Sequence, residues 1–371
     1  MTQASAMLAD PEVVPPERIP QLRIIGSKHN MLWNILRVMK DNEVKGSSFF
    51  DIFGGSGAVG RFFKRRYRII ANDNLYCFHV VQKALITLND SPQFEGLDKF
   101  RSLLPQSRIR GVLDYTNGLQ DIEGFIFQHY TPASLGKDGI ERRYFSRANG
   151  KRIDSIRAKI QEWRDAGLIS PDEYCYLLAS LIIAVQKVAN ISGTYGAFNK
   201  YWDPRAYKPL SLRPIEVISS KFDHKAYCED SLDLVERIHC DIAYADPPYN
   251  DRQYIANYHI LETIARNDDP EIVGITGIRK YTEGEKSDFC SKNSVAAAFR
   301  RLLERVNTDW LILSYNSEGL LSKREIMKAF DSASRFQPAR SYEFPYRRFK
   351  SRRDSGNHPT VEYVFVTRVR K

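Results

Sequence analysis

Cysteine is scarce in this sequence, and its positions follow no disulfide or metal-binding pattern. The 371 residues include five cysteines, and no two of them form a C-x-x-C pair: Cys77, Cys175, Cys228, Cys240 and Cys290. An odd, scattered set predicts reduced thiols in a cytoplasmic protein and disfavours a disulfide framework or a zinc site. The seven histidines show no ligand spacing either, so we expect no metal.

Long apolar runs are also missing. The longest one, residues 177–185, is far shorter than the ~20 residues that span a membrane. The N-terminus has no basic stretch followed by an apolar core, so the sequence shows no secretory signal. We therefore expect no membrane partner.

Negative charge is in the minority. Lys and Arg number 55 against 45 Asp and Glu, which gives a formal net charge of +10. This excess favours a polyanionic partner, although charge alone says nothing about the fold. Hydrophobic residues make up 43%, which is ordinary for a globular protein, and the length predicts about two domains or one core with a large insertion.

Residues 21–91 predict the first part of an α/β domain. A strand at residues 49–53 leads into the glycine-rich loop Gly54-Gly55-Ser56-Gly57-Ala58-Val59-Gly60, and after a helix a second strand ends beside Asp73. Strand, glycine loop, helix, strand and acid in this order are typical of the opening of a Rossmann-like sheet. Residues 1–20 contain several prolines and little periodicity, and we interpret them as a flexible tail.

The pattern changes between residues 92 and 214. Loops rich in glycine, arginine and aromatic residues surround two predicted helices, at 153–163 and 173–190, without alternating strands. We interpret this stretch as an inserted, mainly helical domain. Alternation resumes in residues 215–371, where we expect the second part of the sheet domain. Within it we expect a strand, a polar surface excursion and a closing antiparallel strand pair: residues 241–245, 267–294, 342–346 and 361–369.

The glycine loop by itself suits more than one ligand. Glycines let the backbone pass close to a ligand, and the helix that follows offers free N–H groups. Asp73 would accept hydrogen bonds from both hydroxyls of a ribose. Alone, the loop is equally compatible with a nucleoside cofactor of any kind and with a plain strand-to-helix turn.

A second motif follows the strand predicted at 241–245. Asp246-Pro247-Pro248-Tyr249 would lie at the carboxyl end of that strand, the edge of an open α/β sheet where ligands bind. Two prolines cannot join a hydrogen-bonded ladder, so the backbone leaves the sheet here and holds an acid and an aromatic ring rigidly. A proline turn with a core tyrosine is the structural alternative, which the glycine loop upstream disfavours.

Together the two motifs resemble the Dam-like (alpha-type) adenine-specific DNA methyltransferases, which use S-adenosylmethionine. The resemblance covers most of residues 21–371, in the order cofactor loop, recognition domain, catalytic tetrapeptide. The other elements that resemble the family are Ile25-Gly26-Ser27-Lys28, Asp51-Ile52-Phe53-Gly54-Gly55-Ser56-Gly57, Gly196-Ala197-Phe198-Asn199-Lys200, Glu229-Asp230-Ser231 and Ser314-Tyr315-Asn316-Ser317-Glu318-Gly319, the last seen in relatives that belong to restriction systems.

The resemblance implies a fold and a cofactor site. The expected fold is an α/β, Rossmann-like class I methyltransferase sheet, mostly parallel with a C-terminal antiparallel strand pair, with an inserted target-recognition domain. The residues implied for the cofactor are Lys28, Asp51, Phe53, Gly55, Gly57, Asp73 and Asp230. Lys28 would reach the carboxylate end of S-adenosylmethionine, Asp73 the ribose, and Asp230 or Glu229 the adenine amino group. A solvated lysine and a helix cap are the structural alternatives for Lys28 and Asp230.

The tetrapeptide offers a chemistry for an exocyclic amine. The 6-amino group of adenine is a poor nucleophile because its lone pair is delocalised into the ring. Asp246 and the Pro247 carbonyl could accept its two hydrogens and free that pair, with Pro248 keeping the segment rigid. Tyr249 could stack on the base, which is worth about 1–3 kcal/mol, and the base would have to flip out of the duplex.

Basic residues beside aromatic ones, together with the segment 196–200 that resembles the family, predict contacts with DNA. The candidates are Arg142, Arg143, Arg147, Asn199, Lys200, Arg347, Arg348 and Lys350. The expected partner is double-stranded DNA, and a cognate restriction endonuclease would act in the same system without a stable complex. The inserted stretch matches no recognition element, so the recognised sequence does not follow from the resemblance.

Three alternatives stay open. Adenine in RNA or the N4 amine of cytosine in DNA would need the same geometry, although an aspartate at the first position of the tetrapeptide favours adenine. A nicotinamide-dependent oxidoreductase would leave Asp246 without a role. A catalytically silent nucleic-acid-binding module would not explain why Asp73, Asp246 and Tyr249 stand beside the glycine loop.

Overall fold

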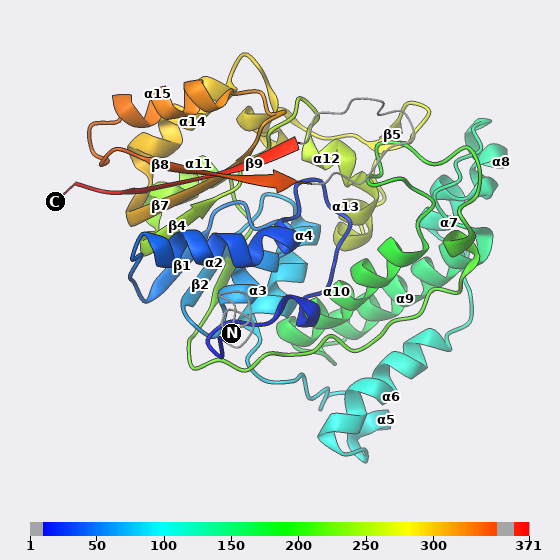
Figure 1. Ribbon diagram of the computed structural model, residues 1–371. Helices are drawn as coiled ribbons and strands as arrows, with labels where there is room; N and C mark the ends of the chain where they lie inside the picture. Colours follow the sequence, from blue (N-terminus) through cyan, green and yellow to red (C-terminus); the bar gives the residue numbers. More distant parts are fainter. Residues whose placement is uncertain (1–9, 347–359, 371) are drawn as a thin grey trace.

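A seven-stranded sheet forms the centre of the computed structural model, which describes residues 10–346 and 360–370 (Figure 1). The strands are β1 (Ser48–Asp51), β2 (Arg68–Asn72), β3 (Lys225–Tyr227), β4 (His239–Ala245), β7 (Asn307–Asn316), β8 (Arg340–Tyr346) and β9 (Thr360–Arg368). Their order is β3-β2-β1-β4-β7-β9-β8; the pairs from β3 to β7 are parallel, and β9 is antiparallel to both neighbours. The predicted class I sheet with its C-terminal antiparallel pair is confirmed.

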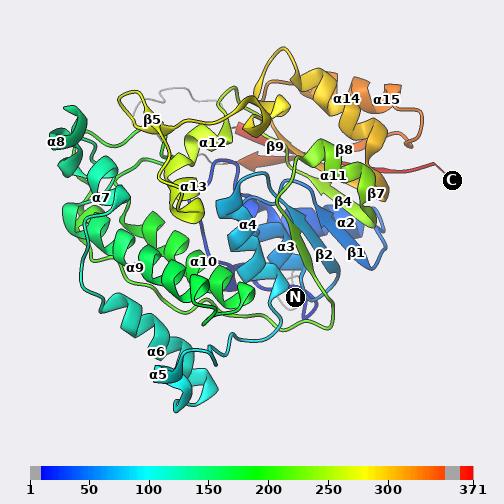
Figure 2. The same ribbon diagram turned by 180° about the vertical axis from the view of Figure 1, so that it is seen from behind.

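Each face of the sheet has its own hydrophobic core, because successive strand residues point to opposite faces. Phe49 and Tyr244 belong to the first core, and Phe50 and Ala245 to the second. Several helices pack on the first core, among them α2 (Leu32–Asp41), α3 (Ala58–Phe63), α4 (Tyr76–Gln82) and α13 (His259–Arg266). Three pack on the second, seen from behind in Figure 2: α11 (Ser231–Arg237), α14 (Val295–Arg305) and α15 (Lys323–Ser332).

The inserted stretch is mainly helical, as predicted. Its helices are α5 (Asp98–Arg101), α6 (Pro105–Asn117), α7 (Phe125–Tyr130), α8 (Leu135–Asp138), α9 (Arg147–Asp165) and α10 (Pro171–Val188). The longest apolar one, α10, packs against α4 and the π-helical turn η3 (Lys83–Thr87), and its buried side chains join the first core. The insertion is therefore continuous with the sheet domain in packing. No helix of the described residues has the length and apolar character needed to cross a membrane.

Side-chain caps set the start of the two long inserted helices. The Ser146 hydroxyl accepts a hydrogen bond of 3.2 Å from the N–H of Asn149, so α9 begins well before the helix predicted from residue 153. Ser170 and Glu173 form a reciprocal capping box with bonds of 3.2 and 2.8 Å, and α10 begins between them. Caps of this kind satisfy N–H groups that the first helical turn leaves unpaired.

The flexible tail predicted over residues 1–20 is wrong for the residues that the structure describes. Val13, Val14 and Ile19 are only 1%, 0% and 3% exposed. The N–H of Val14 also donates a hydrogen bond of 2.8 Å to the carbonyl of Phe62 on α3. The prolines break the periodicity of this segment, but the apolar residues between them still pack on the first core.

The polar excursion predicted over residues 267–294 contains a small hairpin, β5 (Ile272–Val273) and β6 (Ile278–Arg279). Three buried side chains of the insertion donate to the carbonyls of its turn, from Arg142 to Ile275 at 3.1 Å, from Tyr144 to Thr276 at 3.0 Å and from Tyr130 to Gly277 at 2.9 Å. The side chain of Ile275 stays 70% exposed. The hairpin is therefore a rigid extension of the insertion.

Replacement of Ile19 tests whether the N-terminal segment belongs to the core. We expect Ile19→Ala to lower the free energy of unfolding by about 2–5 kcal/mol, as for other buried aliphatic truncations. The exposed Glu17 on the same segment provides the control, and Glu17→Ala should change stability by less than about 0.5 kcal/mol. Denaturant unfolding measures both variants; equal stability of Ile19→Ala and the unmodified protein would contradict the packing.

Candidate active site

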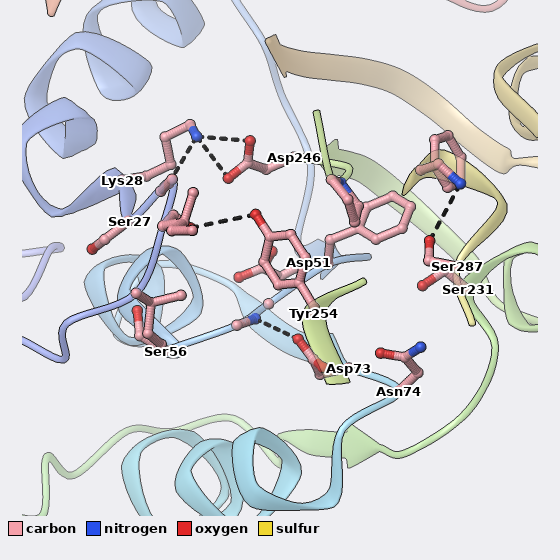
Figure 3. Close-up of a pocket in the computed structure, with 18 of the residues that line it drawn as sticks. Ser27, Lys28, Asp51, Ser56, Asp73, Asn74, Ser231, Asp246, Tyr254 and Ser287 are labelled. Atoms are coloured by element: carbon pink, nitrogen blue, oxygen red, sulfur yellow. Dashed lines mark hydrogen bonds and ion pairs between the residues drawn. The ribbon is translucent and has the colours of Figure 1, made fainter. Parts of the chain in front are cut away.

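A pocket opens at the carboxyl ends of the parallel strands, where the two sequence motifs meet (Figure 3). Its lining brings together most of the residues predicted for the site: Lys28, Asp51, Phe53, Gly55, Asp73, Asp230, Asp246 and Pro248. The end of β1 carries the glycine loop, β2 ends beside Asp73, and β4 ends beside Asp246. Because the register of β1 with β2 and β4 is parallel, these chain-distant residues arrive at one edge of the sheet.

The glycine loop is held by two aspartates. The N–H of Gly55 donates to Asp73 at 3.0 Å, and the N–H of Gly60 donates to Asp51 at 3.2 Å. Gly57 has a φ of 73°, a left-handed conformation that other residues rarely adopt, and it precedes the first residue of α3. The predicted loop geometry thus holds, although Gly57 supports the turn and does not line the pocket.

Burial changes the acidity of both aspartates. It raises the pKa of Asp73 to about 7, although the N–H groups of Leu75 and Gly55 oppose the shift. Burial, and next the negative charge of Asp246, raises the pKa of Asp51 to about 8. Raised pKa values of grouped carboxyls in a cleft are typical of functional sites.

The tetrapeptide leaves β4 as its prolines require. Pro247 is buried, and the carbonyl of Tyr249 accepts a hydrogen bond of 3.0 Å from the N–H of Leu320. The ring of Tyr249 lies close to Gly26, where a Cβ atom would be only 3.0 Å from its Cε1 atom. A glycine at position 26 therefore allows the ring to approach the segment that carries Lys28.

Lys28 is the buried cation of the site. It lies in the turn η2 (Lys28–Met31) and is 4% exposed. Its Nζ atom lies 2.7 Å from the carboxylate of Asp246 (Figure 3). It also lies 3.2 Å from Glu362 and 2.9 Å from the carbonyl of Gly26. Burial alone would lower the pKa of Lys28, but the carboxylates of Asp246 and Glu362 outweigh it and raise that pKa above its ordinary value.

Asp246 is the carboxylate that this lysine balances. Burial raises the pKa of Asp246 to about 7; Lys28 opposes this shift, and the charge of Glu362 adds to it. Glu362 is not among the residues predicted from the sequence, because a glutamate in an alternating strand is ordinary. Its position between Val361 and Tyr363, within the predicted closing strand, was the available signal.

The pocket is strongly acidic. Six of its lining residues are acids and one is a lysine: Asp51, Asp73, Asp230, Asp246, Glu285, Asp288 and Lys28. Glu285 and Asp288 come from the excursion after the hairpin, which the sequence did not connect with the site. An acidic lining suits a cationic ligand, and S-adenosylmethionine carries a sulfonium and an ammonium group. The acidic lining of the pocket therefore fits that cofactor.

The residues predicted to contact DNA divide into four groups. Arg142 is 2% exposed and donates to the hairpin turn and to Asp138, so its prediction as a DNA contact is wrong for this conformation. Arg143 and Asn199 are partly buried and donate to the carbonyl of Lys200 and to Asn190. Arg147 and Lys200 are exposed. Arg347, Arg348 and Lys350 lie outside the residues that the structure describes.

The fold and the site together define a class I methyltransferase. The sheet order, the glycine loop with its aspartate partner and the tetrapeptide at the end of β4 all belong to that class. The chain belongs to the D12 class N6 adenine-specific DNA methyltransferases, whose family model matches residues 25–329. The resemblance to adenine-specific enzymes is thereby confirmed.

Curated relatives agree with this membership. The Type II methyltransferase M.FokI of Planomicrobium okeanokoites is 42% identical over 349 residues, which cover 93% of this chain and 52% of the relative. The Type II methyltransferase M.NlaIII of Neisseria lactamica is 36% identical over 353 residues, or 93% of this chain and 98% of the relative. The modification methylase StsI of Streptococcus sanguinis is 36% identical, with 51% of its length covered. The chain thus spans about half of M.FokI and StsI.

Asp230 shows a second role beside its place in the pocket. Its carboxylate accepts hydrogen bonds of 2.9 and 3.2 Å from the N–H groups of Leu232 and Asp233 and caps α11. We expect Asp230→Ala to lower the free energy of unfolding by about 1 kcal/mol through loss of this cap. The control Asp233→Ala, in the first turn of the same helix, removes an exposed charge and its ion pair with Arg301 but no cap, and should cost about 0.5 kcal/mol or less. Thermal unfolding of both variants checks the assignment; equal losses would contradict the cap.

Proposed function

We propose that this chain transfers a methyl group from S-adenosylmethionine to the N6 amino group of adenine in duplex DNA, as the modification enzyme of a restriction-modification system. One observation carries the proposal: Asp246 and the glycine loop line the same pocket. Family membership supports the base and the type of reaction. The relatives are Type II methyltransferases and modification methylases, which supports the biological setting, and their bacterial sources support a cytoplasmic location.

The site residues would activate the amine and bind the base. The Asp246 carboxylate and the Pro247 carbonyl would accept the two amine hydrogens, which draws the nitrogen towards tetrahedral geometry. Asp246 would then stabilise the positive charge that builds on the nitrogen as the new bond forms. Tyr249 would stack on the flipped adenine, and the rigid prolines would keep the acceptors aligned with the incoming methyl group.

The cofactor would occupy the acidic part of the pocket. When bound, it supplies an electrophilic methyl group on sulfur. Asp73, at the end of β2, would accept hydrogen bonds from the ribose hydroxyls, and the backbone of Phe53 and Gly55 would follow the methionine side. The sequence predicts Lys28 at the carboxylate end of the cofactor. Because its ammonium already donates to Gly26 and Asp246 and forms an ion pair with Glu362, we assign Lys28 to Asp246 instead.

DNA would approach the exposed basic and aromatic residues of the insertion. Tyr201 and Tyr207 are 79% and 62% exposed. The ring of Tyr207 packs against that of Trp202, with 5.3 Å between the ring centres. Lys200 lies in the same segment, with its ammonium 5.9 Å from the centre of the Tyr201 ring. Exposed aromatics beside cations suit phosphate and base contacts. The family description does not favour RNA or cytosine N4 as the substrate.

Methyl transfer to defined nucleic acids tests the proposed function. We expect transfer of labelled methyl groups from S-adenosylmethionine to duplex DNA, with N6-methyladenine as the product, and little transfer to RNA. Asp246→Ala should lower kcat by about 10²–10³-fold or more, because an acceptor made for the transition state is lost, while binding of S-adenosylmethionine by calorimetry remains. Product found only in RNA, only as N4-methylcytosine, or in no nucleic acid would reject the proposal.

The pH dependence of the rate tests the role of Lys28. Asp246 must be ionised to accept the amine hydrogens, and its pKa is raised to about 7, so kcat/KM should fall as the pH falls through about 7. Lys28 lowers this pKa, so Lys28→Met should move the acid limb to higher pH. The exposed Lys45, before β1, serves as the control: Lys45→Met should leave the limb in place. An unmoved limb in Lys28→Met would contradict the assignment.

Salt dependence tests the contact of Lys200 with DNA. If its ammonium neutralises a phosphate, Lys200→Ala should weaken binding of all duplex sequences alike and reduce the slope of log K against log salt by about 1. Lys45 precedes β1 at the amino ends of the parallel strands, away from the pocket, so Lys45→Ala should leave that slope unchanged. Fluorescence anisotropy at several salt concentrations measures both; an unchanged slope for Lys200→Ala would place the DNA elsewhere.

A further inference from the structure

A buried glutamate lies behind the candidate catalytic aspartate. Glu362, near the start of β9, is 1% exposed, and its carboxylate is 3.2 Å from the Nζ atom of Lys28. Its other oxygen accepts a hydrogen bond of 3.1 Å from the side-chain amide of Asn316, at the end of β7. A continuous buried chain of polar contacts therefore runs from Asn316 through Glu362 and Lys28 to Asp246.

In this series of contacts, the single positive charge of Lys28 is shared between the carboxylates of Asp246 and Glu362. With Asp246 as its only partner, Lys28 would neutralise the acceptor on which the substrate amine depends. With Glu362 also bound, the cluster keeps a net negative charge next to the position where positive charge develops. Charge arranged in advance in a buried site costs no reorganisation during the reaction. The amide of Asn316 fixes Glu362, and Glu362 in turn fixes the ammonium.

We propose that Glu362 is a positioning residue for methyl transfer, which holds the Lys28 ammonium behind Asp246 and shares its charge, so that Asp246 remains a strong acceptor. This inference rests on the proposed function. It extends that function to a strand, β9, outside both sequence motifs.

The charged and titratable groups around Asp246 determine in which direction its pKa shifts when Glu362 loses its charge. Those that face it come from η2, β9, β1, β4 and α12 (Tyr254–Asn257): Lys28, Glu362, Asp51, Tyr244 and Tyr254. Lys28 lowers the pKa of Asp246, whereas the charge of Glu362 raises it. Loss of that charge therefore lowers the pKa of Asp246, which is opposite in direction to the loss of Lys28.

Glu362→Gln keeps the shape of the side chain and removes its charge. We expect kcat on duplex DNA to fall about 10- to 100-fold, the range found when a group that orients a functional residue is lost. The acid limb of the kcat/KM profile should move to lower pH, and KM for S-adenosylmethionine should stay near that of the unmodified protein. In a Lys28→Met background the same substitution should change kcat less, because Glu362 acts through Lys28.

A glutamate on the neighbouring strand provides the matched control. Glu343 on β8 pairs with Lys323 at 2.9 Å and is 56% exposed, so Glu343→Gln should leave kcat and the acid limb unchanged. If the unmodified protein methylates DNA but Glu362→Gln keeps its kcat or its acid limb, the proposal is overturned, even when stability falls. If the unmodified protein methylates no DNA, the proposed function fails instead.

A conservative variant covers the case in which Glu362→Gln does not fold. Glu362→Asp keeps the charge but shortens the reach to Lys28 by one methylene. We expect a lower kcat with the acid limb close to its original position. A kcat equal to that of the unmodified protein, or a limb shifted as strongly as in Lys28→Met, would overturn the positioning role.

Discussion

The ion pair between Lys28 and Asp246 is the interaction on which the rest of the site depends. A carboxylate removed from water is costly unless a counter-charge accompanies it, and Lys28 provides one at 2.7 Å. The segment that carries this lysine is itself held in place, because the N–H of Ile25 donates a hydrogen bond of 2.7 Å to the hydroxyl of the buried Tyr258. The N-terminal segment, the end of β4 and α13 thereby form one unit.

Much of this arrangement could be predicted from the sequence because it depends on local patterns. The glycine loop, Asp73 and Asp246 each follow directly after a short apolar strand. Neighbouring parallel strands bring their carboxyl ends to the same edge, so residues far apart in the chain could be assigned to one pocket. The closing antiparallel pair was visible from two alternating segments at the end of the chain.

The residues that sequence reasoning missed or misplaced depend on contacts between distant segments. Glu362 stands in a strand whose alternation gives its face but not the lysine that it meets. Arg142 belongs to a basic cluster that is typical of a surface, yet Asp138 and the hairpin carbonyls satisfy its donors in the interior. Residues 10–20 were misjudged for the same reason. Their sequence has no periodicity, and it does not show that Val13 and Val14 pack on a core built from distant segments.

The three hydrogen bonds that hold the β5–β6 turn have a consequence for how such proteins diversify. Their three donors stand 132 to 147 positions earlier in the chain than the carbonyls that they hold. A chimera that exchanged residues 92–214 for a segment without these three donors would leave the turn carbonyls without those partners. Because the acceptors are backbone carbonyls, the side chains of the turn can vary freely, whereas the insertion must keep donors at the positions of Tyr130, Arg142 and Tyr144.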